Sequence, residues 1–294
     1  EAQRKAEADA VAAGLADDGV GLADGGTGAR AYGEAIGVYL AFVIDKLTDY
    51  HSSICSWNAP GEKLRNVFGR QAIPMTWDYA EGNLFSSSSG SFDNMMQWVV
   101  KVVNEFPNSD SAGVARQFDA QSDNGMRGIL VSTDPPYYDN IGYADLSDFF
   151  YVWLRQSLRR TYPKLFSTML VPKHEELVAT PYRENRGKEG ARDFFEEGMF
   201  STFKQVNKYA REDVPVTIYY AFKQSETETK NDVESTASTG WETMLSAIIR
   251  AGFSINGTWP MRTEKPGRTI GNGANALASS IVLVCRKRPD DAPM

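Results

Sequence analysis

The chain has 294 residues, of which 42% are hydrophobic and 23% are charged, and its formal net charge is −7 at pH 7. This length and apolar content suffice to bury a substantial core, and no apolar run is long enough to suggest a membrane span. The negative charge argues against a protein that coats nucleic acid along its whole surface, although it is compatible with a local basic groove.

Cysteine and histidine are scarce in this sequence. Cys55 and Cys285 lie far apart and form no Cys-x-x-Cys pair, and His51 and His174 are the two histidines. These residues predict neither a disulfide framework nor a zinc site. The charged amino-terminal stretch also lacks the apolar core of a secretory signal. We therefore expect a cytoplasmic protein without a metal centre.

Residues 1–29 begin with an Ala-rich, charged run and continue into a glycine-rich stretch. A nucleotide-binding loop follows an apolar strand and carries its glycines, or a Gly-Lys pair, at strict spacing. No strand precedes these glycines and no lysine follows them. The stretch therefore predicts a flexible amino-terminal segment rather than a cofactor loop.

Residues 30–112 are predicted to form a helical and loop region. Apolar side chains recur at helical spacing over residues 30–50 and again over residues 92–106, which predicts two amphipathic helices. His51 follows the first helix, where a structural role at its carboxyl end is expected. Residues 57–90 look irregular, and such long loops in compact domains tend to be functional. This loop either lines a ligand site or is a packed connector.

An apolar, β-branched run over residues 128–133 ends abruptly in an acid, two prolines and two aromatic residues. The run predicts a buried parallel strand, and open α/β sheets place their ligands at the carboxyl ends of such strands. Two successive prolines restrict the backbone and remove two hydrogen-bond donors, so a rigid corner follows the strand. This corner has the sequence Asp134-Pro135-Pro136-Tyr137-Tyr138.

Helices and strands alternate after this corner. Helical spacing predicts helices over residues 146–158 and 191–210, and the segment 161–190 between them is polar and basic. That segment either contacts phosphates or is a solvated loop. Thr239 and Glu242 match a capping box, which predicts the start of a further helix.

Three more strands are predicted in the final third of the chain, over residues 214–222, 253–261 and 279–285. No helix separates the last two, so we expect them to pair antiparallel within a doubly wound mixed α/β sheet. Residues 113–288 are therefore predicted to form one catalytic core, followed by a short tail over residues 289–294.

The corner Asp134 to Tyr137 resembles the Asp-Pro-Pro-Tyr motif of amino-methyltransferases that use S-adenosylmethionine, above all the adenine-N6 DNA methyltransferases. The surrounding order of elements looks like the carboxyl-terminal half of the Rossmann-like class I methyltransferase fold. The wider sequence is similar to a bacterial and archaeal family of large adenine-specific DNA methylases, the DUF1156-type proteins, some of which occur in anti-phage loci. The stretches that carry this likeness are residues 68–75, 134–153, 216–223 and 275–285, and it covers about residues 30–288.

The resemblance implies a site-specific DNA methyltransferase with S-adenosylmethionine as donor and a flipped adenine in double-stranded DNA as target. It assigns the catalytic role to Asp134, Pro135, Pro136 and Tyr137, with Asp134 also near the donor. Weaker assignments, each weighed against ordinary surface solvation, place Asp78 and Glu81 at the donor. A second set of this kind is placed at the target pocket or the DNA: Tyr138, Arg262, Arg268 and Asn275.

One departure from the family pattern concerns the donor. Such enzymes bind it through a glycine loop after a strand, and no such stretch precedes residue 128 or follows residue 139. We therefore expect a carboxyl-terminal part whose donor-binding half comes from a missing amino-terminal part or a partner chain. The alternative is a non-catalytic binding or assembly subunit of a restriction or phage-defence system. Methylation of another amino group, in cytosine, RNA or a protein glutamine, is a third possibility.

Overall fold

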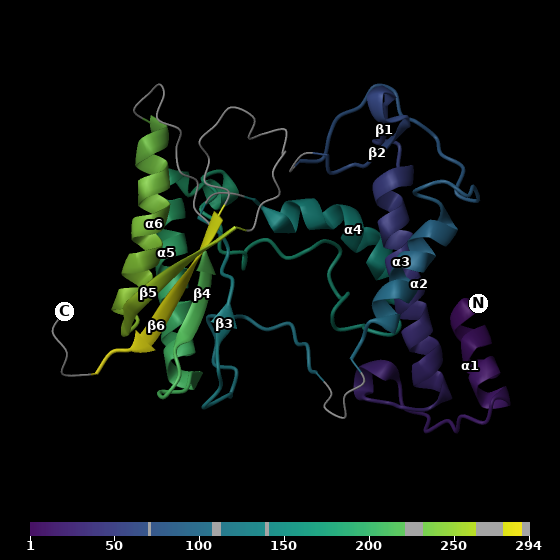
Figure 1. Ribbon diagram of the computed structural model, residues 1–294, viewed down its shortest axis with the longest axis horizontal. Helices are drawn as coiled ribbons and strands as arrows, with labels where there is room; N and C mark the ends of the chain where they lie inside the picture. The colour runs from purple at the N-terminus through teal and green to yellow at the C-terminus, as the bar shows by residue number, and fades with distance from the viewer. Residues whose placement is uncertain (70–71, 108–112, 139–140, 221–231, 263–278, 290–294) are drawn as a thin grey trace. The chain divides into compact units, whose positions relative to one another are not determined.

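Figure 1 shows the computed structural model, which describes residues 1–69, 72–107, 113–138, 141–220, 232–262 and 279–289. The chain divides into two compact units. Unit 1 comprises Glu1–Gly113 and Tyr143–His174, and unit 2 comprises Val114–Gly142 and Glu175–Met294. The first change of unit lies at the predicted boundary near residue 113. The return of residues 143–174 to unit 1 differs from the prediction, which assigns them to the catalytic core.

Unit 1 is built from helices that pack against one long helix, α2. Its helices are α1 (Ala2–Ala12), α2 (Ala29–His51), α3 (Phe92–Asn104) and α4 (Tyr143–Leu158). Two small apolar clusters join α2 to α4 around Ala41 and Leu158, and α2 to α3 around Val43 and Met95. The unit also contains a short antiparallel hairpin of β1 (Ser56–Asn58) and β2 (Lys63–Arg65), and two 3-10 turns, η1 (Leu22–Asp24) and η2 (Ala59–Gly61). The predicted helices over residues 30–50 and 92–106 are therefore confirmed.

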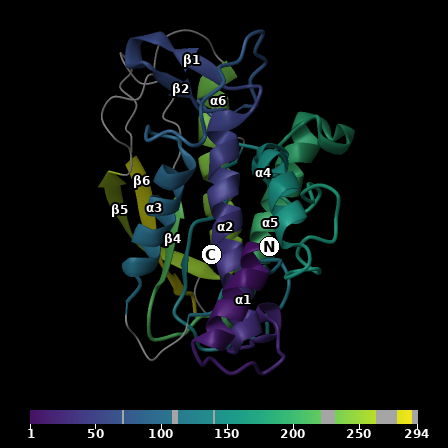
Figure 2. The same ribbon diagram turned by 90° about the vertical axis from the view of Figure 1, so that its right-hand side faces the viewer.

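The amino-terminal segment differs from the prediction of a flexible stretch. Helix α1 lies along α2 (Figure 2), and a Cβ at Gly33 would be only 2.7 Å from the Gln3 carbonyl oxygen. In the loop that follows, the Asp18 carboxylate accepts hydrogen bonds from the backbone of Val20 and Thr27, and these bonds lower the pKa of Asp18. The glycines here allow close backbone packing, so a loop-rich composition encodes a hydrogen-bonded structure.

Unit 2 contains a four-stranded mixed sheet. Its strands are β3 (Ser132–Thr133), β4 (Val216–Tyr220), β5 (Phe253–Arg262) and β6 (Ser279–Lys287), and their order is β3-β4-β6-β5. The pair β3–β4 is parallel, whereas β6 is antiparallel to both of its neighbours. The predicted antiparallel pairing of the last two strands is confirmed. Sequence order does not reveal that β6 inserts between β4 and β5.

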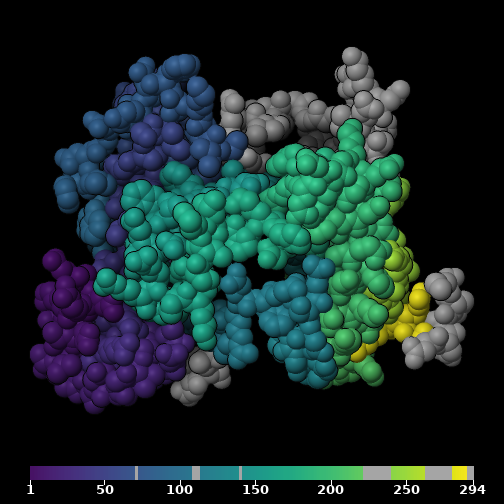
Figure 3. All heavy atoms as spheres, turned by 180° about the vertical axis from the view of Figure 1, so that it is seen from behind, coloured from purple at the N-terminus to yellow at the C-terminus, as the bar shows by residue number. Residues whose placement is uncertain are grey.

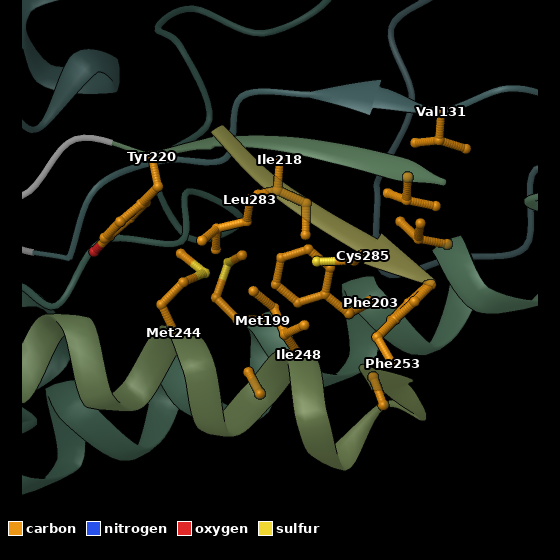
Figure 4. Packing of buried hydrophobic residues seen from close by; sticks show 14 of the residues in the cluster. Val131, Met199, Phe203, Ile218, Tyr220, Met244, Ile248, Phe253, Leu283 and Cys285 are labelled. Carbon is orange, nitrogen blue, oxygen red and sulfur yellow. The ribbon is translucent and has the colours of Figure 1, made fainter. Parts of the chain in front are cut away.

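Two helices, α5 (Gly187–Tyr209) and α6 (Asp232–Arg250), cover one face of this sheet, and a 3-10 turn, η3 (Arg183–Asn185), precedes α5. Figure 4 shows their apolar side chains meeting those of β4, β5 and β6, with Phe203 and Ile248 facing Ile218 and Leu283. These four side chains are almost completely buried. Figure 3 shows the molecule from behind, where the residues of α5 are coloured green. The mixed α/β class predicted from the sequence is thus confirmed.

The strand that leads into the Asp-Pro-Pro-Tyr corner is shorter than predicted. Regular pairing covers only Ser132 and Thr133, and an isolated parallel bridge joins Ile129 to Ala210 upstream of them. The prediction of a fully buried strand is also wrong, since Val131 is buried but Leu130 is 67% exposed. The reason is its position, because β3 is the last strand of the sheet within the described residues and packs on the core with one face.

Candidate active site

The carboxylate of Asp134 follows directly after the last paired residue of β3. Thr133 is in register with Ile218, and the Val131 carbonyl accepts a 3.1 Å hydrogen bond from the Thr217 amide. Asp134 itself is exposed, and partial burial nevertheless raises the pKa of its carboxyl. The sheet therefore fixes the backbone immediately before the acid and leaves its side chain accessible.

The two prolines follow Asp134 in a segment without regular secondary structure. Pro135 is buried and Pro136 is exposed, and no described peptide bond is cis. A proline keeps its carbonyl oxygen while lacking an N–H. Asp134 and the two prolines therefore contribute oxygen acceptors to this segment, and the prolines contribute no N–H donor.

Tyr137 belongs to a row of aromatic rings. Its ring meets that of Tyr220 edge to face, with centroids 5.6 Å apart, and the Tyr220 ring stacks on Trp241 at 5.9 Å. Tyr220 is only 2% exposed and lies in the core of unit 2 (Figure 4), whereas Tyr137 is half-buried. Edge-to-face packing of this kind fixes the plane of an aromatic ring. The corner thus places an oriented ring three residues after its carboxylate.

Tyr138, which the resemblance assigns to a target pocket, packs against the core of unit 2. Its ring lies edge to face on Phe195 of α5, with centroids 5.2 Å apart, and its carbonyl accepts a 2.7 Å hydrogen bond from the Ala179 amide. Tyr138 is partly buried against the core of unit 2. The structure therefore gives this tyrosine a packing role.

The two acidic residues predicted to meet the donor lie in unit 1, whereas Asp134 lies in unit 2. Asp78 and Glu81 are both exposed and belong to a segment without regular secondary structure. The Ala80 amide anchors this segment by donating a 2.9 Å hydrogen bond to the Cys55 carbonyl. Of the predicted donor residues, the structure therefore brings Asp78 and Glu81 together in one segment of unit 1.

The residues predicted to contact DNA from the last hairpin are only partly described. Arg262 ends β5 and is in register with Ser279, the first residue of β6. Arg268 and Asn275 lie outside the described residues.

The basic segment over residues 161–190 is largely neutralised by its own neighbours. Lys173 is 2.7 Å from a carboxylate oxygen of Asp148, and Arg183 is 2.7 Å from one of Glu176. Arg186 pairs with Glu184 at 2.6 Å and also lies over the ring of Phe194. These pairs tie three of the segment's five Lys and Arg side chains to carboxylates.

The described residues contain no cluster of three His, Cys, Asp or Glu side chains that could hold a metal ion. Both cysteines are free and buried, and burial raises the pKa of Cys285 to about 11. His51 ends α2, and its Nε2 is 2.7 Å from the Gly90 carbonyl oxygen, which is consistent with a structural role. None of the described helices has the length and hydrophobicity that a membrane span requires.

Several residues around the corner are not identifiable from sequence reasoning. Tyr220 and Trp241 are visible only as core positions of a strand and a helix, and nothing in their spacing pairs them with Tyr137. Phe195 and Ala179 lie about 40 to 60 residues further along the chain than Tyr138, which both of them contact. Such contacts depend on how the elements pack, and local periodicity does not encode that packing.

Comparison with known proteins adds no assignment, since neither a protein-family model nor a curated protein nor a solved structure matches this chain.

Proposed function

We propose that the Asp134 corner is the target-side half of an amino-methyltransferase active site, and that the target is the N6 amino group of adenine in DNA. The observation that carries this proposal is the position of Asp134, an accessible carboxylate directly after a parallel strand, followed by two prolines and an oriented tyrosine ring. Its sequence resemblance to the Asp-Pro-Pro-Tyr methyltransferases supplies the reaction class.

The chemistry suits these residues. The adenine amino nitrogen is a poor nucleophile because its lone pair is delocalised into the ring. Acceptors on the amino hydrogens favour a localised lone pair and stabilise the positive charge that develops on nitrogen. Asp134 and the Pro135 carbonyl provide two such acceptors. The raised pKa of Asp134 strengthens it as a proton acceptor.

The ring of Tyr137 would support the target base. A base flipped out of the duplex loses its stacking neighbours, and an aromatic face replaces part of that stacking. Because Tyr220 holds Tyr137 from one side, the ring can receive a base without first being ordered. S-Adenosylmethionine, when bound, supplies an already activated methyl group, and the corner contributes mainly by positioning the amino group.

The donor side requires a further segment. Asp134 lies in unit 2, whereas the other two residues assigned to the donor, Asp78 and Glu81, lie in unit 1. Within the described part of the chain, β3 is an edge strand of the sheet that precedes Asp134. An edge strand presents unpaired backbone N–H and C=O groups with which a further strand can pair. We propose that a donor-binding segment, from the same polypeptide or from a partner chain in the cytoplasm, pairs along this edge next to Asp134.

Methyl transfer provides the test. The protein is incubated with unmethylated duplex DNA and S-adenosylmethionine labelled in the methyl group, and the digested DNA is searched for N6-methyladenine. Asp134→Ala should lower incorporation by about 100- to 1,000-fold, as expected for loss of a transition-state acceptor. Asp193→Ala, at an exposed position on α5, is the matched control and should leave incorporation unchanged. Equal incorporation by wild type and Asp134→Ala would exclude the assigned role.

The second candidate is a non-catalytic binding or assembly subunit, for example in phage defence. The absence of a donor-type glycine loop from the sequence favours it. Calorimetric titration with S-adenosylmethionine separates the two candidates, because micromolar binding by this chain would remove the main support for the non-catalytic function. Parallel assays with cytosine-only DNA, RNA and a glutamine peptide would detect a different amino substrate.

A further inference from the structure

Gly240 occupies an unfavourable position for a glycine. The sequence suggests that it lies in a capping box at the start of a helix, but that prediction is wrong, since α6 already begins at Asp232 and continues to Arg250. A glycine inside a helix destabilises it by about 1 kcal/mol relative to alanine. A helix-internal glycine therefore calls for a packing explanation.

Tyr138 provides that explanation. Gly240 is buried, and a Cβ added to it would lie 3.0 Å from the Tyr138 Cβ and 3.2 Å from its Cγ. Both distances are shorter than ordinary van der Waals contact. Because the Tyr138 Cβ is attached directly to the backbone, rotation of the side chain would not relieve the first of these contacts.

Tyr138 has little freedom to move away from such a contact. Its carbonyl accepts a hydrogen bond from the Ala179 amide, and its ring packs edge to face against Phe195, which is completely buried. The next residue of α6, Trp241, stacks on Tyr220, and Tyr220 in turn supports Tyr137. Two successive residues of α6 therefore reach both tyrosines of the corner, one directly and one through Tyr220.

We infer that Gly240 is a positioning residue for the Asp134–Tyr137 corner. Its missing side chain allows α6 to seat Tyr138, and this contact sets the position of the carboxylate and the Tyr137 ring relative to the target base. The inference rests on the proposed function for its catalytic consequence. Its structural part, the seating of Tyr138 by α6, stands without it.

The first measurement tests the structural part alone. Amide hydrogen exchange at Ala179 reports on the bond to the Tyr138 carbonyl, and Gly240→Ala should accelerate it on the order of tenfold. Gly257→Ala is the matched control, because a Cβ at Gly257 in β5 meets nothing within 4 Å. Unchanged exchange at Ala179 in Gly240→Ala would overturn the inference, whether or not the protein is a methyltransferase.

The second measurement tests the catalytic consequence. At saturating duplex DNA, Gly240→Ala should lower kcat several-fold, as expected for a displacement of a few tenths of an ångström, with the Kd for S-adenosylmethionine unchanged. Altered exchange without a change in kcat would overturn the positioning role, provided that the wild type methylates DNA. A wild type that stays inactive when assayed together with the segment or partner chain that binds the donor would instead contradict the proposed function.

A double variant guards against simple unfolding. Tyr138→Ala removes Cγ and the ring, which are two of the three closest approaches to Gly240. Gly240→Ala should therefore accelerate amide exchange at Ala179 less in the Tyr138→Ala background than in the wild-type background. Equal effects in both backgrounds would show that Gly240 acts without Tyr138.

Discussion

The two units differ in how their buried apolar side chains are grouped. Unit 2 collects 18 of its described residues into one buried cluster between its sheet and its two helices. Unit 1 has two clusters of three buried residues each, both on the second half of α2, and leaves Met75, Trp77 and Phe85 at least 80% exposed. The proposed active-site corner is backed by the large cluster, whereas Asp78 and Glu81 lie in a segment with little packing of its own. A site that must hold its geometry benefits from the first arrangement.

The largest expected change in stability comes from removing one large apolar side chain from the core of each unit. Phe203 is 1% exposed in the centre of unit 2, and Phe203→Ala should lower the free energy of unfolding by about 3–5 kcal/mol. In unit 1, Leu47→Ala should cost about 2–3 kcal/mol, because its smaller cluster leaves Leu47 less enclosed. Urea unfolding followed by circular dichroism measures both. A larger loss for Leu47→Ala would contradict the comparison.

A partly buried carboxyl group in unit 1 is expected to make the stability of the protein depend on pH. One carboxylate oxygen of Asp45 on α2 is buried without a hydrogen-bond partner among the described residues, and burial raises the pKa of Asp45 from 3.8 to about 7. The folded protein therefore keeps a proton that the unfolded chain releases, so stability falls as pH rises from about 4 to about 7 and is constant above that.

Asp45→Asn should remove this pH dependence and stabilise the protein at pH 8 by about 1–2 kcal/mol, a figure reduced because the side chain is only half-buried. Thermal unfolding of both proteins at pH 5 and pH 8 measures the difference. If the two proteins lose stability in parallel between these pH values, Asp45 is not the titrating group.

The smallest effect is expected at the surface of unit 2. Arg250 on α6 donates 2.9 Å hydrogen bonds to Glu196 and Glu197 on α5, and its guanidinium lies over the ring of Phe200. Because exposed ion pairs are screened by water and salt, Arg250→Gln should lower the Tm slightly at low salt and less at 0.5 M NaCl. A large, salt-independent loss would show that this pair holds the two helices together.

The predictable part of the proposed site is its local chemistry. Asp134, the prolines and Tyr137 are contiguous, so the sequence specifies the acid, the acceptors and the ring together with the strand that precedes them. Their supports were not predictable, because Phe195, Tyr220 and Gly240 come from three later elements and Ala179 comes from a loop. The resemblance assigns Tyr138 to the target pocket, and only the packing shows that its ring lies on Phe195.

The sequence by itself determined the elements of this protein, since helical periodicity and abrupt strand ends are properties of neighbouring residues. It located most helices to within a few residues, the strand end at Asp134 and the antiparallel closing pair. The tertiary structure decided how these elements combine. It placed α4 in unit 1, inserted β6 between β4 and β5, and extended α6 past its apparent cap so that Gly240 meets Tyr138. The physical reason is that such contacts are selected by the burial of surfaces from distant segments, and no local pattern records which distant surface will fit.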